Sequence, residues 1–251
     1  MFGVILLQKL MSQMRAAMED YDMINEGDKV AVGVSGGKDS LALLYALATM
    51  RRFYPKKYSL VAITLDLGFE GRSDDHTAVA KLCEELDVPY IVKQTQIGEI
   101  IFDVRKEKNP CSLCARMRRG ALHDAAIENG CNRLALGHHL DDAAETFMMN
   151  LLHEGRIGCF SPVSYLSRKK LYMIRPMIYA YEKEVRRAVR NIDLPVMQSR
   201  CPNDGESARQ TAKDLIHSLE KDYPRLRQKI LTALQNGNID GFGKAETNIN
   251  E

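Results

Sequence analysis

The fold is decided by Val32-Gly33-Val34-Ser35-Gly36-Gly37-Lys38-Asp39-Ser40, an apolar run that ends in a glycine-rich turn. The valines before the turn are typical of a strand buried on both faces, and the apolar residues 41–47 after it continue as a helix. The two adjacent glycines permit the sharp turn that joins strand to helix. The free N–H groups and the dipole at the helix start, together with the two serine hydroxyls, favour binding of an anion such as phosphate.

This segment is not a Walker A loop, which needs Gly, four residues, Gly-Lys and then Ser or Thr. Val32 stands in place of the first glycine, and Asp39 stands in place of the hydroxyl that binds Mg²⁺. No Gly-x-Gly-x-x-Gly fingerprint fits either. Residues 35–40, called turn 35–40 below, instead match Ser-Gly-Gly-x-Asp-Ser and so resemble the PP-loop ATP pyrophosphatases, which implies cleavage of ATP between its α and β phosphates. The alternative is a tight strand-to-helix turn that binds no ligand.

The composition describes an ordinary α/β protein. The 251 residues are enough for one large domain with a small appendage, and a net charge of +2 argues neither for nor against a polyanionic partner. Basic residues nevertheless gather in clusters, each of which is either a solvated helix face or a contact for nucleic acid. The clusters are Arg116, Arg118 and Arg119; Arg168, Lys169 and Lys170; Lys183, Arg186, Arg187 and Arg190; and Arg225, Arg227 and Lys229.

The sequence offers no targeting or membrane segment. The apolar residues 2–7 are too short for a signal peptide and lack a basic segment and a cleavage site, and no apolar stretch approaches a membrane span. We therefore expect a cytoplasmic protein without a membrane partner. In that compartment the six cysteines are not expected to form a disulfide framework, so paired cysteines become candidates for metal or redox chemistry.

Strands alternate with helices along most of the chain. Further strands are predicted at residues 60–66, 89–92, 133–136, 163–166 and 171–175. Helices are predicted at residues 4–21, from Ser73 and Asp74 to about Leu86, and at residues 182–190, 208–222 and 225–235. The methionines of the first helix are expected in the core. This alternation predicts a doubly wound parallel sheet whose ligands bind beyond the carboxyl ends of the strands.

Four segments follow from this reading. We expect an N-terminal helix at 1–24, the phosphate-binding α/β domain at 25–180, a C-terminal helical segment at 181–235 and a disordered tail at 236–251. Because turn 35–40, Asp66 and residues 137–142 all follow strand ends, they should face one crevice.

Two cysteines, Cys111 and Cys114, are spaced so that both thiolates can reach one metal centre. Structural zinc would need two more ligands, and no second Cys-x-x-Cys or His-x-x-x-His follows; zinc and a redox disulfide remain alternatives. Cys201 lies next to a proline, as cluster-binding cysteines often do, and three thiolates would leave one iron of a [4Fe-4S] cluster open to sulfide. Cys83 and Cys131 are expected to be inert core residues.

The residues after the fourth strand, Gly137-His138-His139-Leu140-Asp141-Asp142, are called turn 137–142 below. With Glu145 they can hold Mg²⁺ or polarise a phosphate, although carboxylates near a helix start also simply stabilise its dipole. We favour the functional interpretation, because this turn should lie opposite turn 35–40.

Several motifs together resemble the tRNA 2-thiocytidine synthetase (TtcA) family. They are Ser-Gly-Gly-Lys-Asp-Ser at 35–40, Leu65-Asp66, Cys-Ser-Leu-Cys-Ala-Arg-Met-Arg-Arg-Gly at 111–120, Gly-His-His-Leu-Asp-Asp at 137–142, Ile174-Arg175-Pro176 and the lone Cys201. The resemblance implies the fold of PP-loop ATPases, similar to the adenine nucleotide alpha hydrolases, with an N-terminal helix and a C-terminal helical extension. It also implies tRNA thiolation: ATP adenylates the C2 oxygen of a cytidine in the anticodon loop, and sulfur then displaces AMP.

The same resemblance implies a set of cofactors, partners and site residues. It implies a [4Fe-4S] cluster on Cys111, Cys114 and Cys201, Mg²⁺ on Asp39, an anticodon stem-loop, a sulfur donor such as a cysteine desulfurase or free sulfide, and a homodimer. The expected catalytic residues are Lys38, Arg118, Asp141 and Asp142. The expected ATP-binding residues are Val34, Ser35, Gly36, Gly37, Lys38, Asp39, Ser40, Leu65, Asp66, Gly137 and His138.

Two departures from the family pattern leave the thiolated base open. Cys201 stands in Arg-Cys-Pro-Asn-Asp-Gly where better-known members carry a Cys-x-x-Cys pair, and residues 155–162 contain Cys159 where the family has a glycine- and proline-rich loop. The alternatives are a 2-thiouridine enzyme, although the zinc-binding cysteine pairs of those relatives are absent here, and an enzyme that thiolates or desulfurates a small molecule. Lysidine-type tRNA ligation is disfavoured, because it needs no Cys-x-x-Cys. The non-enzymatic alternative is a nucleotide-binding iron–sulfur redox sensor.

Overall fold

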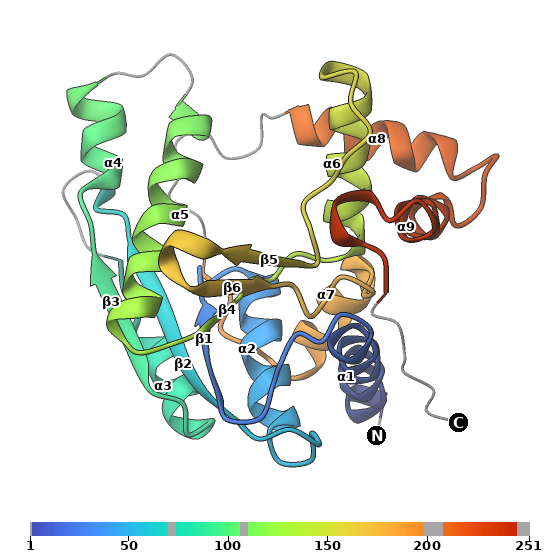
Figure 1. Ribbon diagram of the computed structural model, residues 1–251. Helices are drawn as coiled ribbons and strands as arrows, with labels where there is room; N and C mark the ends of the chain where they lie inside the picture. The colour runs from blue at the N-terminus through green and yellow to red at the C-terminus, as the bar shows by residue number, and fades with distance from the viewer. Residues whose placement is uncertain (1, 70–73, 106–109, 198–207, 245–251) are drawn as a thin grey trace.

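The computed structural model describes residues 2–69, 74–105, 110–197 and 208–244. A six-stranded sheet in the order β3-β2-β1-β4-β6-β5 forms the centre of the molecule (Figure 1). The strands are β1 (Asp28–Gly33), β2 (Tyr58–Asp66), β3 (Tyr90–Gln94), β4 (Arg133–Ala135), β5 (Val163–Leu166) and β6 (Leu171–Ile174). The helices are α1 (Phe2–Asp20), α2 (Lys38–Met50), α3 (Thr77–Glu85), α4 (Ile97–Glu99), α5 (Pro110–Glu128), α6 (Leu140–His153), α7 (Glu182–Asn191), α8 (Ala208–Leu219) and α9 (Leu226–Asn236).

The order of the strands places the two predicted turns next to each other. β1 pairs in parallel with β2 on one side and with β4 on the other, so the chain moves outward through β2 and β3 and then returns to the middle of the sheet. Such a reversal is the switch point at which doubly wound folds bind their ligands. The predicted parallel sheet is confirmed, with one addition: β5 pairs antiparallel with β6 at the edge.

Helices pack against both faces of the sheet. On one face α1, α2 and α7 share a hydrophobic core in which Met14 and Met18 are fully buried, as predicted for the methionines of the first helix. On the other face Ala125 and Ala126 of α5 pack against Ile63 and neighbouring strand residues. The sheet is therefore buried on both sides, which explains why its central strands are apolar without alternation.

The helix after β2 begins later than predicted. It starts at Thr77, because the backbone N–H of Asp74 donates to Asp66 Oδ2 at 3.2 Å and the carboxylate of Asp75 accepts from the N–H of Thr77 at 2.9 Å. Asp74 thus belongs to the loop rather than to the helix cap. Ser73, the other predicted cap, lies outside the described residues.

The predicted disorder from residue 236 is wrong as far as Lys244. A short 3₁₀ turn at Ile239–Gly241 is followed by Phe242, which is fully buried and lies edge-on to Tyr21 with ring centroids 6.5 Å apart. The hydroxyl of Tyr21 donates to the carbonyl of Phe242 at 3.2 Å. One buried aromatic ring therefore fixes a segment whose composition favours disorder, and residues 245–251 lie outside the described part of the chain.

Within the described ranges, the structure contains no helix that combines the length and the hydropathy needed to span a membrane.

Candidate functional site

Turn 35–40 has the geometry of an anion-binding loop. Gly36 has φ +77°, and a Cβ there would lie 2.6 Å from Met197 Sδ, so both the backbone angle and the space require glycine. The hydroxyl of Ser40 donates to the carbonyl of Gly37 at 2.9 Å and accepts from the N–H of Ser35 at 3.1 Å. No side-chain hydrogen bond caps α2 at Gly37, which leaves the first N–H groups of the helix to an anion.

Turn 137–142 packs directly against the start of α2. A Cβ on Gly137 would lie 3.1 Å from the carbonyl carbon of Asp39, so the close approach of the two turns depends on this glycine. His139 and Asp142 form a capping box on α6: His139 Nδ1 accepts from the N–H of Asp142, and Asp142 Oδ2 accepts from the N–H of His139 at 2.9 Å. Part of this motif therefore serves to start a helix.

The two turns border one cavity of about 450 Å³. It is also lined by Leu65 at the end of β2 and by Ala115 and Arg118 of α5. The residues predicted from the sequence that line it are Val34, Ser35, Asp39, Ser40, Leu65, Arg118, Gly137, His138 and Asp142. The other residues predicted for catalysis or ATP binding, Gly36, Gly37, Lys38, Asp66 and Asp141, are not among the described lining residues. The structure thus brings together three strand ends and two helices, α5 and α8, that are far apart in the sequence.

Three arginines of the described residues line this cavity. Arg118 and Arg119 come from α5, and Arg209 comes from α8. Of these three, only Arg118 was predicted from the sequence as a site residue. A cavity lined by several cations and by the N-terminal end of a helix is suited to a polyphosphate.

Asp39 presents an oxygen that makes no hydrogen bond to any described residue. Its Oδ2 accepts from Lys38 Nζ at 2.9 Å, whereas its Oδ1 is buried and has only His139 Nε2 nearby, at 3.8 Å. A buried carboxylate oxygen without a partner is costly unless it meets a ligand. Because Mg²⁺ prefers carboxylate and phosphate oxygens, this atom fits the Mg²⁺ ligand predicted at Asp39.

Asp141 and Asp142 are engaged by other parts of the chain instead. Asp141 Oδ2 accepts from the N–H of Glu182 at 2.7 Å, and its Oδ1 lies 2.8 Å from Arg227 Nε as an ion pair without hydrogen-bond geometry. Asp142 Oδ1 accepts from Arg209 Nη1 at 2.6 Å. Figure 1 shows α8 and α9, which carry these two arginines, beside α6. The two aspartates therefore fasten the C-terminal helices to the site.

A second set of charges surrounds Lys38. Its ammonium lies 3.2 Å from Glu182 Oε1, and Lys213 Nζ donates to Glu182 Oε2 at 2.6 Å. Burial disfavours ionisation of Glu182, but the two lysines outweigh it and lower its pKa to about 2. Burial likewise opposes the charge on Lys38, and its two carboxylate neighbours raise its pKa nevertheless. Lysine and glutamate are both firmly charged.

Two further titratable groups are shifted by burial. Burial, with the positive charge of Arg175, lowers the pKa of His138 well below its usual range, so its ring is neutral at pH 7. The ring of His138 lies 5.0 Å from that of Phe160. Burial, with the charge of Asp142, raises the pKa of Glu145 to about 7. A neutral imidazole in the cavity suits contact with a base or a sugar rather than with phosphate.

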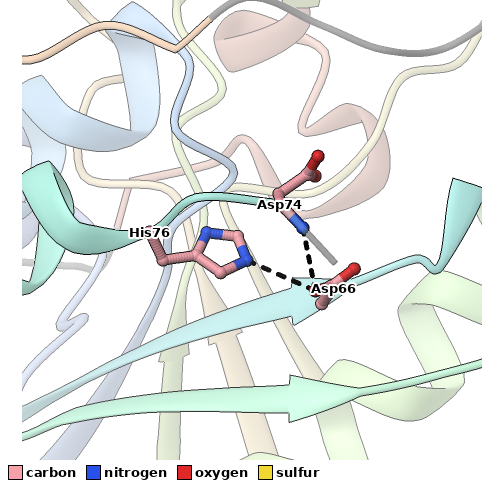
Figure 2. Close-up of side chains that lie close together, drawn as sticks. All are labelled: Asp66, Asp74 and His76. Carbon is pink, nitrogen blue, oxygen red and sulfur yellow. Dashed lines mark hydrogen bonds and ion pairs between the residues drawn. The ribbon is translucent and has the colours of Figure 1, made fainter. Parts of the chain in front are cut away.

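A group of possible metal ligands lies at the end of β2. Asp66, Asp74 and His76 each offer one ligand atom, and these atoms lie within 4.8 Å of one another. Figure 2 shows the imidazole of His76 turned toward Asp66, at 3.7 Å from Oδ2. The carboxylate of Asp66 accepts from the N–H groups of Gly68 and Asp74, and its role in the structure is to hold the loop after β2.

The predicted cluster ligands lie at the start of α5. Cys111 is exposed and Cys114 is half-buried, one helical turn apart, and Cys114 precedes Ala115, which lines the cavity. Neither cysteine is among the described residues that line the cavity, but both lie on the helix that borders it. Cys201 lies outside the described residues. Cys83, Cys131 and Cys159 are buried; burial raises the pKa of Cys159 to about 12, which makes this thiol inert.

Comparison with known proteins agrees with this geometry. The PP-loop domain family matches residues 6–211. A tRNA-cytidine(32) 2-sulfurtransferase from Citrifermentans bemidjiense is 38% identical over 231 residues, which cover 91% of this chain and 90% of that protein. The chain belongs to the tRNA 2-thiocytidine synthetase family of PP-loop proteins. The family resemblance predicted from the motifs is confirmed.

Two solved structures are similar to the chain. The U34-tRNA thiolase NcsA from Methanococcus maripaludis, with its [4Fe-4S] cluster, aligns with a TM-score of 0.77 and 30% identity over 93% of this chain and 79% of that one. An NH₃-dependent NAD synthetase from Campylobacter jejuni aligns with a TM-score of 0.51 and 15% identity over 92% of each chain, which shows the fold alone.

For this member of the family, sequence motifs predicted the residues at strand ends and missed their distant partners. Glu182, Arg209, Lys213 and Arg227 were not named as site residues. Glu182, Arg209 and Arg227 each contact a residue that was, and Lys213 contacts Glu182. They lie on helices after the sheet, at no fixed spacing from the motifs. The one available signal was the charge of these helices, which does not identify a partner.

Proposed function

We propose that this protein is an ATP-dependent tRNA sulfurtransferase that forms 2-thiocytidine at position 32 of the anticodon loop. The relative from Citrifermentans bemidjiense, similar over nearly its whole length, bears that activity in its name. One observation supports it on chemical grounds: turn 35–40, turn 137–142 and the helix that carries Cys111 and Cys114 border a single cavity. Activation of the base and delivery of sulfur can therefore take place in one site.

The first step activates the base. The O2 atom of cytidine attacks the α phosphorus of ATP, and pyrophosphate leaves. We assign the departing pyrophosphate to the N–H groups of turn 35–40 and to Lys38, and a Mg²⁺ ion to Asp39, whose Oδ1 accepts no hydrogen bond from the described part of the chain. Arg118 lines the cavity and would offset the charge that develops on the α phosphate.

The second step exchanges oxygen for sulfur. Sulfide attacks C2, and AMP leaves and carries the former O2 atom as one of its phosphate oxygens. This oxygen is a good leaving group only after adenylation. Cys111, Cys114 and Cys201 would hold a [4Fe-4S] cluster, which when bound supplies an iron site for the incoming sulfur. The exposure of Cys111 supports a route by which sulfur reaches this end of the cavity.

Recognition of the substrates is assigned to the sides of the cavity. We assign the adenine to the backbone around Leu65, close to Asp66, and the ribose and base contacts to the neutral ring of His138. The target cytidine must leave its stack to enter, as in other enzymes that modify bases. Arg119 and the basic clusters would bind the phosphates of the anticodon stem-loop.

Asp141 and Asp142 are assigned a supporting role in this reaction. Because their oxygens contact Arg227, Arg209 and backbone N–H groups, we propose that they hold the C-terminal helices in place rather than bind Mg²⁺ themselves. We further propose a cysteine desulfurase or free sulfide as sulfur donor, a homodimer and a cytoplasmic location.

Thiolation of uridine 34 is the second candidate. The U34-tRNA thiolase from Methanococcus maripaludis shares the fold with a TM-score of 0.77. Its 30% identity is lower than the 38% to the cytidine enzyme, which favours cytidine.

The test is reconstitution of thiolation on tRNA. The full chain, purified without oxygen and loaded with iron and sulfide, is incubated with ATP, Mg²⁺, sulfide and unmodified tRNA, and the nucleosides are analysed by mass spectrometry. We expect 2-thiocytidine that maps to position 32. Thiouridine would support the second candidate, and the absence of any thionucleoside would contradict both.

A further inference from the structure

Glu182 lies at the start of α7, outside the motifs of the family resemblance, and its carboxylate contacts three cations. Oε1 lies 3.2 Å from Lys38 Nζ and accepts from Arg186 Nη2 at 2.8 Å, and Oε2 accepts from Lys213 Nζ at 2.6 Å. The side chain is 13% exposed, so these contacts are only partly screened by water. One carboxylate therefore links the phosphate turn to α7 and α8.

The ammonium of Lys38 contacts two carboxylates and does not line the cavity. Its ammonium lies between Asp39 Oδ2 at 2.9 Å and Glu182 Oε1 at 3.2 Å. Lys38 is not among the described lining residues, although its neighbours Asp39 and Ser40 are. A phosphate group that enters turn 35–40 must therefore compete with Glu182 for this ammonium.

We propose that Glu182 is a positioning residue that competes with the phosphates of ATP for Lys38 and so sets the affinity of the site for ATP and pyrophosphate. This inference rests on the proposed function, because it assigns Lys38 to the phosphates of ATP. Lys213 acts on the same carboxylate from the other side. Lys213 neutralises part of the charge of Glu182. It therefore weakens the ion pair between Glu182 and Lys38 and favours contact of the Lys38 ammonium with the phosphates of the nucleotide.

The chain contains a matched control two residues along the same helix. Glu184 is 12% exposed, and its carboxylate pairs with Lys9 at 2.7 Å and accepts from Gln13 at 2.8 Å, both on α1. Glu184→Gln removes the same formal charge from α7 as Glu182→Gln but touches neither Lys38 nor Lys213. It separates the competition for Lys38 from a general change in charge.

The experiment measures binding without turnover. The full chain and its variants are titrated calorimetrically with α,β-methylene-ATP, which cannot be cleaved between the α and β phosphates, and with pyrophosphate. Glu182→Gln is expected to bind both ligands about three- to tenfold more tightly, and Lys213→Met about two- to fivefold more weakly, as follows from the size of partly exposed charge pairs. Glu184→Gln should stay within about twofold of the unmodified protein on the same grounds.

Opposite shifts of the two variants would support the competition, because a purely structural role would weaken binding in both. The proposal is overturned if both variants shift affinity in the same direction, or if Glu184→Gln reproduces Glu182→Gln. If Glu182→Gln does not fold, Lys213→Met decides alone: weaker binding supports the proposal, and unchanged or tighter binding contradicts it.

The experiments distinguish failure of the Glu182 proposal from failure of the proposed tRNA reaction. Failure of the unmodified protein to bind the analogue would overturn this inference together with the assigned ATP site. Opposite shifts in a protein that forms no thionucleoside would leave the competition standing and overturn only the tRNA reaction.

Discussion

Turn 35–40 and turn 137–142 follow adjacent strands and pack against each other, yet their carboxylates are held in different ways. Asp39 in the first turn keeps a buried oxygen without a hydrogen-bond partner. In the second turn, all the carboxylate oxygens of Asp141 and Asp142 contact arginines or backbone N–H groups. The carboxylates of the two turns thus differ: Asp39 keeps one oxygen without a hydrogen bond to the described residues, and Asp141 and Asp142 connect α6 to the C-terminal helices.

The largest effect is expected at Asp39. Asp39→Asn keeps the size of the side chain and removes the charge that would bind Mg²⁺, so release of pyrophosphate should fall about 1,000-fold, which corresponds to about 4 kcal/mol. The melting temperature should change little, because Oδ1 makes no hydrogen bond in the protein. The rate of pyrophosphate release, with and without EDTA, measures the first effect, and thermal unfolding measures the second. A variant whose melting temperature falls together with its rate of pyrophosphate release would contradict the assigned role, because Asp39 would then stabilise the fold as Asp141 does.

Asp141 should show the reverse pattern. Asp141→Asn removes the charge opposite Arg227, which is buried, and should destabilise the protein by roughly 3 kcal/mol. For a chain of this size that lowers the melting temperature by about 6–12 °C. A double-mutant cycle with Arg227→Met should recover part of the loss, because the buried guanidinium is then removed and the carboxylate of Glu220, which also pairs with Arg227, is more exposed to water. Loss of ATP cleavage at full stability would instead place Asp141 in the chemistry.

Glu145, one turn into α6, predicts a pH dependence of stability. Its pKa is about 7 in the folded protein against 4.5 in the unfolded chain, so between these values the native state binds the extra proton and stability falls as pH rises. We expect the unfolding free energy to drop by about 2 kcal/mol from pH 4.5 to 7 through this group. Urea denaturation at several pH values should show a flatter profile for Glu145→Gln. If the unfolding free energies of the two proteins differ by the same amount at every pH, the shifted pKa of Glu145 is contradicted.

The smallest effect is expected at Arg209. Its side chain is 41% exposed, so Arg209→Met should cost about 0.5–1 kcal/mol of stability although its contact with Asp142 measures 2.6 Å. Because Arg209 also lines the cavity, the KM for ATP should rise a few-fold while kcat changes less. Steady-state kinetics on both parameters measure this. A loss confined to kcat would place Arg209 at the reacting atoms.

The difference between turn 35–40 and turn 137–142 also explains which features could be predicted from the sequence. The parallel sheet, the convergence of strand ends and the lining residues of turn 35–40 followed from local patterns, since a buried strand, two glycines and a helix start lie next to one another in the chain. Asp39 could be recognised in this way as well. Its place in the turn is set by neighbours in the chain, although Gly137 and His139 of turn 137–142 also lie close to it.

The partners of the second turn could not be predicted. Arg209 and Arg227 lie 67 and 86 residues beyond the aspartates they contact, and nothing in an isolated sequence pairs them. Phe242 was missed because a single aromatic residue among glycines and asparagines has no periodicity. The late start of α3 was missed because Asp74 hydrogen-bonds to Asp66 in the loop instead of capping the helix.

The products formed from ATP labelled at the α phosphate test the central claim most directly. Incubation of the cluster-loaded protein with labelled ATP, sulfide, and either unmodified tRNA or no tRNA separates activation of a base from simple hydrolysis. The account predicts labelled AMP in equal amount to 2-thiocytidine, and only with tRNA. Labelled ADP, or AMP formed equally without tRNA, would contradict it.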